Sequence, residues 1–190
     1  MTLAEPELGA GTVTRYWGTP ITIDKLPIDD IIGPGLSGIG AAGPARETLD
    51  LRQVLDDPDR LADEFLASFT ALAAAQDPND PPAITGAHVE VQVWRHGYDE
   101  PAAGHGSDFI GWCFLATSPA PAHSESGALS LADPRAGSAM TAMPGLPWGR
   151  QVMVRPVPGA HLAAPGWLTS SVVPLERGQF AVIAVAQSVR

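Results

Sequence analysis

The sequence predicts a mainly β protein, a sandwich or jelly roll with a helical N-terminal segment packed on one face. Two observations lead to this fold class. Helical spacing of apolar residues between positions 57 and 72 gives way, from position 88, to the alternation that is typical of strands. Short apolar runs then follow at even spacing, separated by turn residues among the 20 Gly and 19 Pro of the chain. A helical first third followed by short strands favours this architecture.

The predicted helix begins at the segment Asp57-Pro58-Asp59. This segment supplies an N-cap, a proline at the first helical position and a carboxylate near the positive end of the helix dipole. Apolar residues then recur at helical spacing and form one face: Leu61, Phe65, Phe69 and Leu72. The run of Asp, Asn and Pro over positions 77–82 ends the helix. We expect its apolar face to pack against a sheet.

The clearest strand covers positions 88–94, where Val89, Val91 and Val93 share one face. Positions 16–23 predict a first edge strand, because Pro20 is tolerated only at an edge. The Gly-rich stretch 31–44 predicts a loop. The other strand candidates are 110–117, 128–132, 151–156, 160–164 and 179–187.

Composition predicts one domain, residues 1–190, and excludes several classes of function. The formal net charge is −10 with only 11 basic residues, which argues against nucleic acid and against an anionic membrane surface. No segment has the apolar length of a membrane span and no signal peptide is recognisable, so we expect a cytoplasmic protein. Cys113 is the single cysteine, which excludes an internal disulfide; its apolar surroundings predict an inert, buried thiol.

Several segments, taken in order, resemble motifs of a family of 2-oxoglutarate/Fe(II) oxygenases. The run Gly127-Ala-Leu-Ser-Leu-Ala-Asp-Pro-Arg135 resembles its G-x-L-x-F-x-D-P-R motif. The others are Trp17-Gly-Thr-Pro-Ile21, Trp94-Arg-His-Gly-Tyr98, Phe109-Ile-Gly-Trp-Cys-Phe-Leu115, Pro158-Gly159 and Pro165-Gly-Trp-Leu168. Together these segments cover nearly the whole chain. The resemblance implies the family's fold, a double-stranded β-helix, which is a cupin-like jelly roll.

Enzymes of this family hold Fe(II) with two histidines and a carboxylate, and an arginine commonly pairs with the distal carboxylate of 2-oxoglutarate. The matching first segment contains one histidine, His105, followed two positions later by Ser107 rather than a carboxylate. Ser170 stands where the second histidine is expected, and Gln179 or Phe180 stands where the arginine is expected. The iron constellation is therefore not recoverable, and His105 is the metal ligand only if a metal binds at all.

Three residues are candidates for acid/base catalysis: His105, Asp108 and His161. His105 and Asp108 form His-x-x-Asp in a Gly-rich loop, which is compatible with a surviving half-site and equally with ordinary polar loop residues. His161 lies on a predicted strand. It is compatible with a proton carrier that faces the barrel interior, and also with a partly buried, hydrogen-bonded histidine.

Five residues are candidates for substrate binding: Tyr98, Trp112, Arg135, Trp167 and Ser170. Tyr98 follows a strand end at the predicted mouth of the barrel, and Arg135 is placed to hold a substrate carboxylate. Trp112 and Trp167, with Trp148, are candidates for the walls of an apolar pocket. A turn is the simpler explanation for Tyr98 and also explains Arg135, and core packing is the default explanation for the tryptophans.

Three functions remain open. The first is a small-molecule enzyme of oxygenase ancestry that acts without the usual iron and 2-oxoglutarate, as an isomerase, cyclase or lyase on a biosynthetic intermediate. The second is a working Fe(II)/2-oxoglutarate hydroxylase in which His105 acts with Asp108 or His161. The third is a non-catalytic binding protein. The first two require a small-molecule partner, only the second requires Fe(II) and 2-oxoglutarate as cofactors, and a homodimer is compatible with all three.

Overall fold

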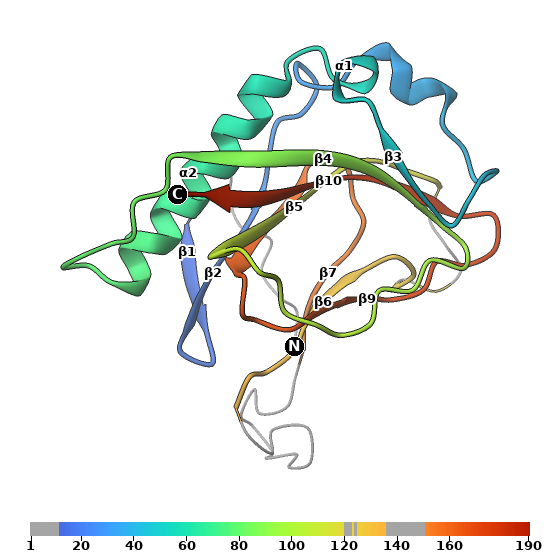
Figure 1. Ribbon diagram of the computed structural model, residues 1–190. Coiled ribbons are helices and arrows are strands. Elements are labelled where there is room, and N and C mark those ends of the chain that lie inside the picture. The colour runs from blue at the N-terminus through green and yellow to red at the C-terminus, as the bar shows by residue number, and fades with distance from the viewer. Residues whose placement is uncertain (1–11, 120–122, 124, 136–150) are drawn as a thin grey trace.

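A computed structural model describes residues 12–119, 123, 125–135 and 151–190, which form two antiparallel sheets (Figure 1). The larger sheet has the strand order β1-β2-β8-β5-β10-β4-β3 and the smaller one the order β7-β6-β9. The strands are β1 Val13–Tyr16, β2 Thr19–Lys25, β3 Arg46–Leu49, β4 Gly86–Arg95, β5 Phe109–Thr117, β6 Leu129–Leu131, β7 Val152–Val154, β8 Ala160–Pro165, β9 Ser170–Val172 and β10 Phe180–Val189. The helices are α1 Leu51–Val54 and α2 Pro58–Gln76, with a 3-10 helix at Pro34–Gly38. The predicted mainly β fold class is confirmed.

Helix α2 begins where the sequence predicts. The Asp57 carboxylate accepts a hydrogen bond from the Arg60 backbone N–H at 2.9 Å, and Pro58 occupies the first turn. The predicted apolar face is buried, with Leu61, Phe65, Phe69 and Leu72 each 0% exposed. Neither α-helix in the described ranges has the length and apolarity to span a lipid bilayer.

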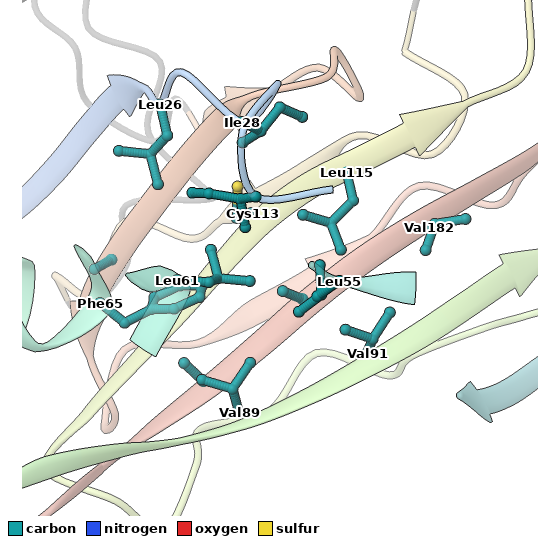
Figure 2. Close-up of a cluster of buried hydrophobic side chains, with 14 of the residues drawn as sticks. Leu26, Ile28, Leu55, Leu61, Phe65, Val89, Val91, Cys113, Leu115 and Val182 are labelled. Carbon is teal, nitrogen blue, oxygen red and sulfur yellow. The ribbon is translucent and has the colours of Figure 1, made fainter. Parts of the chain in front are cut away.

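The larger sheet lies between two hydrophobic layers. Figure 1 shows α2 across one face of this sheet and the small sheet on the other side. The layer under α2 contains Val89, Val91 and Cys113 (Figure 2). The second layer, between the sheets, contains Trp94 and Trp112 among other apolar side chains. Successive residues of one strand thus point to opposite layers, as the pleat requires.

The burial of Cys113 agrees with the expectation of an inert thiol. The side chain is 0% exposed, and burial raises the pKa of the thiol to about 12. A thiol that stays protonated at neutral pH is a poor nucleophile.

The segment 16–23 was wrongly predicted as a single edge strand. Trp17 and Gly18, with φ of 55° and 86°, form the turn of a hairpin that joins β1 to β2. Of these two strands, β1 lies at an edge of the sheet and β2 does not. Pro20 is tolerated in β2 because it pairs with Arg15 of β1 and lies outside the ladder with β8, which begins at Thr22.

Candidate functional site

A pocket of about 320 Å³ lies on the part of the larger sheet's inner face that side chains of the small sheet do not cover. We call it the inner pocket. Strand β4 explains its polarity, because the valines of β4 face α2 and the alternate residues, including Glu90 and Gln92, face the pocket. Strands β3, β5 and β10 supply further lining residues, and the loop after β4 supplies Tyr98, Glu100 and His105.

Gln92, at 4% exposed, organises the polar side of this pocket. Its Oε1 accepts hydrogen bonds from Trp94 Nε1 at 2.9 Å and from Arg46 Nε at 3.1 Å, while its Nε2 donates to Glu90 Oε2 at 2.9 Å. Arg46 Nη2 also lies 3.9 Å from Glu90 Oε2. The network satisfies the buried amide and places the Arg46 charge beside that of Glu90.

Tyr98 and Glu100 form a second polar pair in the pocket wall. The Tyr98 ring stacks on Trp94 with a centroid distance of 5.0 Å, and its hydroxyl donates to Glu100 Oε2 at 2.9 Å. Burial, with a further contribution from Glu100, raises the pKa of Tyr98 far above its usual range. The phenol therefore stays protonated at neutral pH and remains a hydrogen-bond donor.

His105 lies in the same wall, with its Nε2 2.9 Å from Ser170 Oγ. Its ring meets Trp112 edge-on at a centroid distance of 5.6 Å. Burial lowers the pKa of His105, and the nearby Glu100 carboxylate offsets part of that change. The imidazole is therefore neutral at pH 7 and has a lone pair available on one nitrogen.

Backbone hydrogen bonds hold the His105 loop against the corner after β8. His105 N donates to Gly166 O at 2.6 Å, and Gly166 N donates to Asp108 O at 2.7 Å. Ala103 and Ser170 exchange two further backbone hydrogen bonds of 3.1 and 3.0 Å. A Cβ on Gly166 would lie 1.8 Å from the backbone oxygen of Ser107, so only glycine permits this approach.

The structure thus brings together two residues that the family resemblance placed in the metal site, His105 and Ser170. Asp108 does not join them. Its Oδ1 accepts a hydrogen bond from Arg190 Nη2 at 2.8 Å, and this bond is the main reason that the pKa of Asp108 lies below its usual value. Both residues of the ion pair line a second hollow, the outer groove, together with Trp167. His105 borders both hollows.

His161 faces α2 and not the space between the sheets. Its Nε2 lies 2.9 Å from Ser68 Oγ, its ring packs 4.9 Å from that of Phe65, and it is 1% exposed. It stands opposite Cys113 in the β5–β8 ladder and therefore shares the helix-facing side of the sheet. Burial lowers the pKa of His161 to about 4. The interpretation as a buried, hydrogen-bonded histidine describes this geometry.

The remaining candidates divide between the pocket and other places. Tyr98 and Trp112 line the inner pocket, whereas Trp167 is 55% exposed and lines the outer groove. Arg135 forms an ion pair with Asp133 at 2.6 Å and is not among the residues that line the inner pocket. Ser170, at 3% exposed, contacts His105 Nε2 and is not among the residues that line the inner pocket. Trp148 lies outside the described residues.

Sequence reasoning missed six polar residues of the pocket: Arg46, His88, Glu90, Gln92, Glu100 and Gln187. The alternation in β4 contained a usable signal for three of them, since His88, Glu90 and Gln92 share a face with the buried Trp94. No pattern marked Arg46, because its strand, β3, has four residues and was not predicted. Glu100 lies in a loop, whose conformation follows from its contacts and not from a period.

No known protein family matches the chain by sequence, and no curated protein does. The structure is similar to several solved structures, among them those of three enzymes. They are a prolyl-4-hydroxylase of Pseudomonas putida (14% identity, 67% of this chain and 65% of that chain, TM-score 0.47), the rice dioxygenase for auxin oxidation (15%, 86% and 64%, 0.49) and SnoK, a non-heme α-ketoglutarate-dependent carbocyclase from nogalamycin biosynthesis (15%, 80% and 69%, 0.41). The chain spans slightly less than two thirds of the first two. The likeness concerns the fold alone, the one that the sequence resemblance implied.

Proposed function

We propose that the protein is an enzyme of 2-oxoglutarate/Fe(II) oxygenase ancestry that performs metal-independent acid/base chemistry on a small organic molecule in the inner pocket. The contact between His105 Nε2 and Ser170 Oγ at 2.9 Å carries the proposal. It fixes a neutral imidazole in the wall of a polar pocket, which is what a general base at neutral pH requires.

In this proposal Ser170 positions the imidazole and His105 is the catalytic residue. When Nε2–H donates to Ser170 Oγ, the lone pair of Nδ1 is available, and the described residues provide no hydrogen-bond partner for that atom. Once Nδ1 has taken a proton from the substrate, the imidazolium keeps its bond to Ser170. Ser170 itself is 3% exposed, which argues against a role as the nucleophile.

Two neighbouring groups support the same role. The Glu100 carboxylate favours the protonated form of His105, so it stabilises the imidazolium that forms when the base acts. The Tyr98 hydroxyl stays protonated and donates to Glu100 Oε2, which holds this carboxylate in the pocket wall. A neutral base beside a carboxylate that stabilises its protonated form is suited to proton abstraction from carbon, as in an isomerisation, cyclisation or elimination.

The residues present do not fit Fe(II) and 2-oxoglutarate. Fe(II) of this family needs three ligands on one face, and no group of three or more His, Cys, Asp or Glu side chains converges in the part of the chain that the structure describes. Ser107, at the expected carboxylate position, donates its hydroxyl to Phe109 O, and Asp108 is paired with Arg190. Trp112, which is 1% exposed, packs among the apolar side chains between the two sheets.

Deuterium exchange tests the proposal without knowledge of the substrate. Chelator-treated protein is incubated in D₂O with a pool of small polar metabolites, and mass spectrometry detects deuterium at carbon as well as new products. We expect exchange without added Fe(II) or 2-oxoglutarate, and a loss of about a hundredfold or more in His105→Asn. His123→Asn is the matched control, because His123 does not line the inner pocket.

Three results would contradict the proposal. Exchange that persists at the wild-type rate in His105→Asn would remove His105 from catalysis. Conversion that appears only with Fe(II) and 2-oxoglutarate present would instead support the hydroxylase. Binding of pool members without any exchange or product would support the non-catalytic binding protein.

A further inference from the structure

We infer that the molecule bound in the inner pocket carries a protonated amine, which pairs with Glu100 and places an adjoining carbon at His105. This inference rests on the proposed function and names the substrate class for the same site. It is carried by the distribution of charge and of hydrogen-bond acceptors around the pocket, and not by the overall acidity of the chain.

Three of the residues lining the pocket carry a formal charge: Arg46, Glu90 and Glu100. Arg46 approaches Glu90 to 3.9 Å and its Nε is engaged by Gln92, so the Glu90 charge has a cation beside it. Glu100 accepts one hydrogen bond, from the neutral hydroxyl of Tyr98, and makes no ion pair with any described residue. One negative charge in the pocket is therefore left for a ligand to compensate.

The two donors nearest Glu100 and Gln92 are engaged within the pocket wall. Tyr98 uses its single donor on Glu100, and Trp94 uses its indole N–H on Gln92. The second oxygen of Glu100 remains as an acceptor, and an ammonium group is a donor without any acceptor atom. A ligand carboxylate would instead bring a second negative charge next to Glu100, in a half-buried place where like charges repel strongly.

Aromatic walls next to Glu100 suit the carbon skeleton of such a ligand. The stacked Tyr98 and Trp94 rings and the Trp112 ring line the pocket beside the two polar groups. A volume of about 320 Å³ lies within the range of small-molecule sites. Pairing of the amine with Glu100 leaves His105 Nδ1 unblocked, so the atom that takes the proton is separate from the carboxylate that holds the amine.

Three probes that differ only in their polar group test the inference: 2-phenylethylamine, 2-phenylethanol and 3-phenylpropanoate. Each is titrated into wild-type protein at pH 7.5, with the indole N–H signal of Trp94 as the NMR reporter of the inner pocket. We expect the amine to bind at least tenfold more tightly than the alcohol, and the carboxylate more weakly than both. Glu100→Gln should reduce the affinity for the amine to that for the alcohol. Asp99→Asn, the adjacent exposed carboxylate outside the pocket, should change nothing.

Tighter binding of the carboxylate than of the amine, or no detectable binding of the amine at about 20 mM, would overturn the inference. An amine affinity unchanged in Glu100→Gln would overturn it as well. The order of affinities in the wild type is decisive even if the Gln variant does not fold. All of these outcomes leave the deuterium exchange at His105 as a separate test, so failure of the inference and failure of the proposed function are distinguishable.

Discussion

Lowering the pH from 7.5 to 4.5 is expected to destabilise the protein through His161, and a His161→Gln variant should be spared that loss. The imidazole is 1% exposed between α2 and the sheet, and its Nδ1 has no hydrogen-bond partner there. The Nε2 contact with the Ser68 hydroxyl suits a neutral ring. A protonated ring would place an unpaired N–H and a net charge among apolar side chains, which is costly.

The magnitude follows from the pKa of His161, which burial lowers from 6.5 to about 4. Because the folded value is below the unfolded value, the unfolded chain binds more protons between these two pH values. Stability is therefore complete above pH 6.5, falls as the pH drops towards 4 and is constant below that. At pH 4.5 the expected loss from this one residue is about 2.5 kcal/mol in the free energy of unfolding.

Urea unfolding monitored by tryptophan fluorescence at pH 7.5 and 4.5 provides the assay. Carboxylates also titrate in this interval, but they do so in both proteins, so the difference in pH-dependent loss between wild type and His161→Gln isolates the histidine. His88→Gln, at an exposed position of β4, controls for removal of a histidine elsewhere. Equal losses in wild type and His161→Gln would refute the argument, and would mean that the site stays accessible to water.

Four further substitutions test the loop that carries His105 and the residues that contact it. Gly166→Ala should lower the free energy of unfolding in urea by about 3 kcal/mol, because the added Cβ would lie 1.8 Å from a backbone oxygen. Gly106→Ala is the control and should be neutral, because a Cβ there has no atom within 4 Å. Ser170→Ala should lower the free energy of unfolding by about 1 kcal/mol, because the hydrogen bond to His105 is lost. An unchanged midpoint in thermal unfolding would contradict this expectation. Asp108→Asn should leave the urea midpoint unchanged, since its ion pair with Arg190 is exposed to solvent and screened.

Local signals were sufficient for the elements whose pattern matches their environment. Helix α2 has an N-cap at Asp57 and one apolar face, because only that face packs on the sheet. Polar and apolar residues alternate along β4, because α2 covers its valines while the residues on the opposite face line the solvent-accessible pocket. In both elements one side faces solvent and the other the core, so the apolar residues recur with a period that the sequence shows.

Short or locally ambiguous elements were not predictable in the same way. Strand β9, Ser170–Val172, has three residues and is defined by pairing with β6, a contact between segments about 40 positions apart. The turn at Trp17 places a bulky residue at positive φ, where glycine is the usual choice, so it carries no turn signal of its own. Such features depend on tertiary contacts, which a single sequence does not display.

The placement of His161 on β8 could not be predicted from the sequence, unlike that of the polar residues on β4. On β4 the polar and apolar residues alternate, so the direction of each side chain could be inferred. On β8 the residues after His161 are Leu162, Ala163 and Ala164, all apolar and all buried, because this strand lies between α2 and the small sheet. A shift of one residue would reverse every side chain without changing that pattern. Only the pairing of His161 with Cys113 places the histidine under the helix, so the choice between a proton carrier and a core residue required the register of the sheet.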